Sequence, residues 1–117
     1  MKLNIAIISL ISVLTSSFVF ANTLGLEQNQ DGGWNVTYAS DGDIAGFQFN
    51  VDGATINSAS GGAAQDAGFM VSASATTALG FSLSGTTIPS GEGVLLVLDT
   101  EGTPSGLSGI IVSDPNG

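Results

Sequence analysis

The sequence predicts an all-β fold, a two-sheet jelly-roll or immunoglobulin-like β-sandwich of about eight or nine strands. Three observations predict it. Short stretches alternate apolar and polar residues, which is the period of a half-buried strand. Turn residues, mainly Gly next to Asp, Ser or Pro, separate these stretches. No window shows a sustained apolar period of 3.6 residues, so long amphipathic helices are not expected.

Residues 1–21 are expected to be a secretory signal peptide and not part of the sandwich. Lys2 precedes an apolar run over 3–19, and the small residues Val19 and Ala21 stand at −3 and −1 of a cleavage site. Ser and Thr interrupt the apolar run, which argues against a membrane anchor. We therefore expect one domain over 22–117, secreted to the extracellular space or cell surface, with no membrane association after cleavage.

Eight strands are predicted, and in most of them apolar side chains recur at every second position. In chain order they cover 23–27, 34–39, 44–51, 54–58, 69–74, 78–84, 93–99 and 107–113. The faces expected to be buried carry Leu24 and Leu26; Trp34, Val36 and Tyr38; Phe47, Phe49 and Val51; Phe69, Val71 and Ala73; and Leu79, Phe81 and Leu83. The strand over 93–99 is apolar on both faces, as in a central strand. The longest irregular stretch, 58–68, is expected to hold a helical turn at 63–65.

The charge balance excludes several classes of function. Lys2 is the only basic residue, and ten carboxylates follow it without a single Lys, Arg or His. Nothing in the domain can neutralise phosphate, so nucleic acid and anionic membranes are excluded as partners. Ser or Thr nucleophiles need a His or Lys base, which is absent. Two carboxylates could serve a glycosidase, but no pair is placed to line a cleft, and no enzyme activity is expected.

No cofactor is expected, with calcium as the open alternative, because calcium takes oxygen ligands alone. The candidate ligands are Asp41 with Asp43, and Asp99 with Glu101. The competing interpretation is that Asp beside Gly only shapes a turn. Sugar binding would need exposed aromatic rings, and Trp34 with Tyr38 are the candidates. Because these two share a face with Val36, they are also expected in the core.

The order of motifs resembles bacterial cohesin domains. The motifs are "WNVTY", "DIAGFQFNV", "AGFMVSAS", "ALGFSLSG" and "TIPSGEGVLLVLD", and they extend over most of residues 24–113. The resemblance implies a nine-stranded jelly-roll without catalytic residues. It also implies a dockerin-like protein partner and a role in assembling extracellular, polysaccharide-degrading complexes. Whether the cohesin-like domain over 22–117 continues beyond its last residue stays open, because "SDPNG" directly follows a strand.

The same resemblance implies that the partner meets one sheet, formed by strands 44–51, 69–74, 78–84 and 93–99. The outward residues expected there are Gln48, Asn50, Ser72, Ser82 and Ser84. Three functions remain open: a module for protein interaction, a carbohydrate-binding module, and a structural subunit of a surface layer or matrix. A flat polar sheet face would favour the first, an exposed aromatic row the second, and a sheet edge left open for strand exchange the third.

Overall fold

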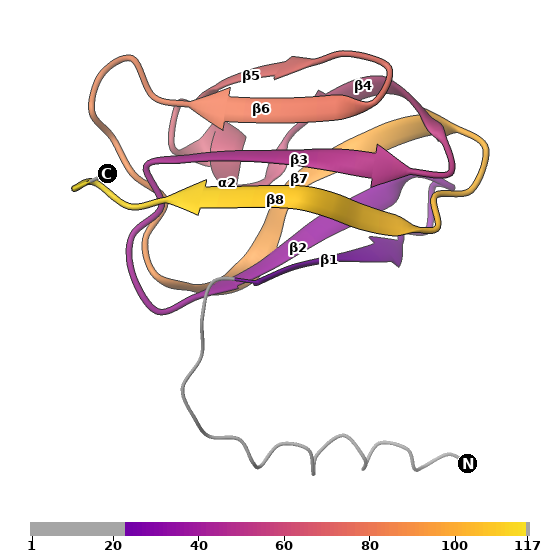
Figure 1. The fold of residues 1–117 in the computed structure, drawn as a ribbon. Coiled ribbons are helices and arrows are strands. Elements are labelled where there is room, and N and C mark those ends of the chain that lie inside the picture. Colours follow the sequence, from indigo (N-terminus) through magenta and orange to yellow (C-terminus); the bar gives the residue numbers. More distant parts are fainter. Residues whose placement is uncertain (1–22, 117) are drawn as a thin grey trace, which may run out of the picture.

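Residues 23–116, which a computed structural model describes, form eight β-strands and one short helix (Figure 1). The strands are β1 (Thr23–Gln28), β2 (Trp34–Ser40), β3 (Gly46–Asp52), β4 (Thr55–Ser60), β5 (Met70–Ala73), β6 (Thr77–Phe81), β7 (Gly91–Glu101) and β8 (Gly106–Ser113), with α2 (Gly62–Asp66) between β4 and β5. Each predicted strand is present, and the predicted helical turn at 63–65 lies within α2. The predicted signal peptide lies outside the described residues.

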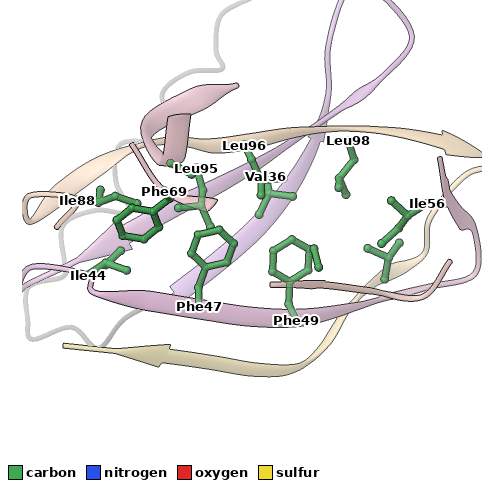
Figure 2. Packing of buried hydrophobic residues seen from close by; sticks show 13 residues of the cluster. Val36, Ile44, Phe47, Phe49, Ile56, Phe69, Ile88, Leu95, Leu96 and Leu98 are labelled. Carbon is green, nitrogen blue, oxygen red and sulfur yellow. The ribbon is translucent and has the colours of Figure 1, made fainter. Parts of the chain in front are cut away.

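Two antiparallel four-stranded sheets make up the molecule. One has the order β1-β2-β7-β4, and the other has the order β5-β6-β3-β8. The inner faces of the two sheets enclose the core between them (Figure 2). The structure therefore confirms the all-β, two-sheet sandwich.

The core forms where β3 faces β2 and β7. Phe47 and Phe49 extend from β3 toward Leu95, Leu96 and Val36 of the opposite sheet (Figure 2). All five side chains are buried, and so is the expected inward residue Val51. Polar Gln48 and Asn50 alternate with them and are only half-buried. The predicted alternation of β3 is confirmed. Successive side chains of a strand point to opposite faces, so Phe and Val take the core-facing positions and Gln and Asn the outward ones.

A β-bulge explains the continuous apolar run of β7. Val36 pairs with Leu96 while Thr37 pairs with Val94, so Leu95 is an extra residue opposite β2. Leu95 and Leu96 are both fully buried as a result, although they are consecutive. The expectation of a central strand is correct, since β7 lies between β2 and β4.

The predicted inward face of β6 is wrong. Leu79, Phe81 and Leu83 were expected in the core, but Leu79 is 39% exposed, Leu83 is 76% exposed and Phe81 is half-buried. Ala78 and Gly80 face the core instead. The reason is the neighbouring strand: Phe47 pairs with Gly80, and its ring occupies the space that a side chain at position 80 would need.

The two sides of the sandwich differ. On one side, α2 connects the edge strands β4 and β5, and its Ala64 is fully buried. There Ile56 of β4 donates its N–H to the carbonyl of Ala75, at 2.9 Å, in the turn after β5. On the other side, the edge strands are β1 and β8, and the helix of residues 23–116, α2, lies away from them (Figure 1).

Candidate functional site

The predicted partner sheet differs from the observed one in a single strand. Strands β3, β5 and β6 do lie together, but β7, which holds residues 93–99, belongs to the opposite sheet. Its place beside β3 is taken by β8. The apolar pattern of β7 could not reveal this, because a central strand looks the same in either sheet. The candidate surface is therefore the outward side of β5-β6-β3-β8, called the outer face below.

The strand register brings the outward residues of this sheet into rows. One row crosses the sheet through Ser72, Leu79, Gln48 and Ile111. A second row runs through Met70, Phe81, Gly46 and Ser113. A third row joins Thr77, Asn50 and Ser108. Carboxylates are absent from these three rows, so the middle of the outer face is uncharged.

Large apolar side chains dominate two of these rows. Met70 is 53% exposed and Ile111 is 58% exposed, and half-buried Phe81 lies next to Met70. All the exposed large hydrophobic residues among 23–116 lie on β5, β6, β8 or the loop after β6. The opposite sheet contributes none of them. The outer face is thus an apolar surface with polar groups between its hydrophobic side chains.

Three of the five expected partner-binding residues lie on this face. Gln48 is half-buried between Leu79 and Ile111, and Ser72 is exposed at the β5 edge. Asn50 is already engaged within the sheet, because its Oδ1 accepts a hydrogen bond from Thr77 Oγ1 at 2.7 Å. Gln48 at the centre of the outer face and Ser72 at its β5 edge are therefore the expected residues that can hydrogen-bond a partner.

Ser82 and Ser84 are not placed as predicted. β6 ends at Phe81, so both serines belong to the loop that follows it. The Ser82 hydroxyl accepts hydrogen bonds from the N–H groups of Ser84 at 3.2 Å and Thr86 at 2.9 Å. It also lies 2.8 Å from Thr86 Oγ1. These contacts stabilise the turn of the loop and are the physical reason for the early end of the strand.

Carboxylates lie at opposite ends of the outer face. Asp52 is the last residue of β3, and Asp114 directly follows β8. Since the start of β3 pairs with the end of β8, the two carboxylates are at opposite ends of this strand pair. Ser108 Oγ donates to Asp52 Oδ1 at 2.9 Å, which fixes that end of the face. No Lys, Arg or His exists in residues 23–116 to pair with either carboxylate.

Trp34 and Tyr38, the candidate sugar platform, are half-buried and pack against the core. Tyr38 pairs with Gly93, where a built Cβ would lie 3.4 Å from the tyrosine ring. The two rings thus occupy the core-facing side of β2, as the alternative interpretation expected. All the aromatic side chains in residues 23–116 are buried or half-buried, so this part of the chain carries no exposed aromatic row.

The four candidate calcium ligands form two separate pairs. Asp41 and Asp43 belong to the turn before β3, where Asp43 Oδ1 accepts the N–H of Ser90 at 3.2 Å. Asp99 and Glu101 are exposed on β7, which extends two residues beyond the predicted strand end. Among residues 23–116, no three Asp, Glu, His or Cys side chains gather where they could hold a metal ion. Calcium binding at either pair stays a prediction.

The apolar residues of the outer face were the part that sequence reasoning missed. Met70 and Ile111 were not proposed as site residues, and Leu79 was assigned to the core. One signal was present for Leu79: glycine at position 80 is out of place between two large apolar residues unless a neighbouring ring covers it. No such signal marks Ile111. Ile110 and Ile111 are consecutive and so face opposite sides of the sheet, and the bulge before them decides which of the two faces outward.

Comparison with protein-family models, with curated proteins and with solved structures found no match. Within residues 23–116, none of the helices has the length and hydrophobicity needed to cross a membrane.

Proposed function

We propose that this protein is a secreted, non-catalytic module that binds a protein partner through the outer face of β5-β6-β3-β8. The observation that carries the proposal is the exposure of Met70, Leu79 and Ile111 on one uncharged sheet face. Several large apolar side chains exposed on the same face of a small domain are typical of a protein interaction site. The resemblance to cohesins implies a partner on three of the four strands of this face, β3, β5 and β6, and suggests a dockerin-like partner in an extracellular assembly.

The charge distribution indicates what that partner carries. Asp52 and Asp114 lie at the two ends of the face, and the whole described domain is acidic. A partner with apolar contact residues at its centre and Lys or Arg at its periphery would match this arrangement. Complementary charge at the edge of an interface mainly raises the association rate, and salt weakens that effect. The association rate is therefore expected to fall as sodium chloride is added.

The test uses proteins captured from the native culture medium by the immobilised chain. Leu79→Asp and Ile111→Asp place a carboxylate on the outer face at exposed positions, so folding should be retained. Gln30→Asp is the matched control, since it adds the same charge at an exposed site in the turn after β1. We expect the captured proteins to be lost with both face variants and kept with the control.

A different result would assign another function. If the face variants capture the same proteins as the wild type, the outer face is not the binding surface. If Trp34→Ala also abolishes retention on insoluble polysaccharide, the protein is a carbohydrate-binding module. Melting curves of every variant show beforehand that each one is folded.

A further inference from the structure

A cleft opens on the side of the sandwich between β1 and β8. It has a volume of about 410 Å³. Its apolar lining residues are Leu24, Leu26, Trp34, Pro104, Leu107 and Ile110. They come from both sheets and from the loop that joins β7 to β8. No charged residue lines this space, which is called the side cleft below.

The two sides of the sandwich are bordered differently, because only the side opposite the cleft has a helix that joins the edge strands. There α2 connects the edge strands, and the carbonyl of its buried Ala64 accepts the N–H of Phe69 at 2.9 Å. On the edge of β4, Ile56 also donates its N–H to the carbonyl of Ala75. Beside β1 the described residues hold no helix. The loop after β7 lines the cleft there, and its Ser105 donates its N–H to the carbonyl of Asp52 on β3, at 2.8 Å, and not to β1.

β1 offers a regular edge next to this cleft. All six of its residues pair in sequence with β2, from Thr23 opposite Ala39 to Gln28 opposite Trp34, without a register shift. On its other side, β1 pairs with no strand of residues 23–116. A row of backbone N–H and C=O groups is therefore open to strand addition along β1.

A bulge in β8 directs Ile110 into the side cleft. Gln48 pairs with Ile111 and Asn50 pairs with Ser108, so Phe49 lies opposite both Gly109 and Ile110. Gly109 adopts a φ of +57°, which glycine tolerates and most other residues do not. Ile110 consequently lines the cleft while its neighbour Ile111 lies on the outer face.

Carboxylates lie near both ends of β1. Glu27 is exposed near its end, and Asp31 follows in the next turn. At its beginning, Thr23 pairs with Ala39, which in turn pairs with Glu92 of β7. The described residues contain no cation that could pair with these three acids. A strand that adds to β1 would therefore gain from a Lys or Arg at each of its ends.

We propose that the side cleft accepts one extended segment of another protein, which adds to β1 as a strand. Alternate apolar side chains of the segment enter the cleft, and its terminal Lys or Arg residues approach Glu27, Asp31 and Glu92. A second copy of this chain is the poorer occupant, because residues 23–116 provide only negative charge for such an interface. The site is separate from the outer face.

The test uses a short synthetic peptide in which valine and threonine alternate between two terminal lysines. Two analogues serve as controls: one carries glutamate at both ends, and the other is N-methylated at alternate residues and cannot pair as a strand. Binding to the purified chain is measured by fluorescence anisotropy. Amide exchange of β1 is followed with and without the peptide. We expect the lysine peptide alone to bind and to slow exchange along β1.

A matched pair of variants separates this site from the outer face. Ile110→Asp places a charge in the cleft, whereas Ile111→Asp places the same charge on the outer face one residue away. Because the peptide would cover a carboxylate that has no cation beside it in the cleft, Ile110→Asp should weaken peptide binding about tenfold or more. Ile111→Asp should leave it unchanged while it abolishes capture of the outer-face partner.

Several results would overturn the proposal. These are the absence of peptide binding to the wild type, equal binding of the glutamate or N-methylated analogue, and equal loss in both variants. Sedimentation of the wild-type chain as a dimer that Ile110→Asp dissociates would also overturn it, because the occupant would then be a second copy.

Discussion

The ring of Phe47 lies directly over Gly80, so that a Cβ at this position would overlap the ring atom Cζ. The two residues are paired neighbours on β3 and β6. Phe47 also stacks with Phe49 and with Phe69, each at 6.1 Å between ring centroids. Glycine at position 80 thus leaves room for the central ring of the aromatic cluster.

Gly80→Ala is expected to lower the free energy of unfolding by about 1–3 kcal/mol, because the added methyl group overlaps the Phe47 ring. Urea melts give this value. Gly42→Ala is the control, since its Cβ would meet no heavy atom within 4 Å, and it should stay within about 0.5 kcal/mol. In a Phe47→Ala background the cost of Gly80→Ala should shrink, because the overlapping ring is gone. Equal costs in the two backgrounds would contradict the ring-over-glycine contact.

The orientation of β3 can be tested at two adjacent positions. Phe47→Ala removes a buried ring and should destabilise the protein by about 3–5 kcal/mol. Gln48→Ala changes an outward, half-buried side chain and should cost no more than about 0.5 kcal/mol. Urea melts of both variants compare the two values. A larger loss for Gln48→Ala would mean that the strand faces the other way.

The bulge at Gly109 should be sensitive to any side chain. Gly109→Ala forces a φ of +57° on alanine and brings its Cβ to 2.7 Å from Asn50 Nδ2. We expect a loss of about 1–3 kcal/mol in thermal or urea melts. Gly106→Ala, on the same strand, is the control, because its Cβ would meet nothing within 4 Å. A neutral result at position 109 would contradict the left-handed bulge.

Salt should stabilise the domain. Ten carboxylates and no cation in residues 23–116 repel one another in dilute buffer. The screening length falls from about 10 Å at 0.1 M salt to about 3 Å at 1 M. The melting temperature is therefore expected to rise with sodium chloride alone. If it responds only to micromolar calcium and not to sodium chloride, a specific metal site and not screening governs stability.

Local patterns predicted most of the fold, and neighbouring strands decided the rest. The alternation in β3 identified Phe47 and Phe49 as inward residues, because the period of a strand depends only on its own backbone. The direction of Leu79 could not be read in the same way, since it depends on which residue of β3 lies beside Gly80. The sheet to which β7 belongs depends on long-range pairing, which an apolar run does not encode.

The sequence predicted most of the strands that form the outer face, but not the apolar side chains that they expose. Gln48 and Ser72 do lie on the outer face, as the alternation implied. The apolar character of that face comes from Leu79 and Ile111. Leu79 faces outward because its neighbours Ala78 and Gly80 face the core, and Ile111 faces outward because of the bulge at Gly109. Bulges shift a register by one residue without leaving a sequence pattern that is distinct from an ordinary strand glycine.

The pairing of early strands with late ones determines when this chain can fold during its synthesis. β2 needs β7 as its inner neighbour, and β3 needs β8, so neither sheet can be completed before the last strands exist. Such long-range pairing makes folding slow compared with the pairing of adjacent strands. Until β7 and β8 have been synthesised, β2 and β3 therefore each lack one of their two neighbouring strands. A chain shortened before β7 would keep the pairs β1-β2, β3-β6 and β5-β6 and leave the inner edges of both sheets open.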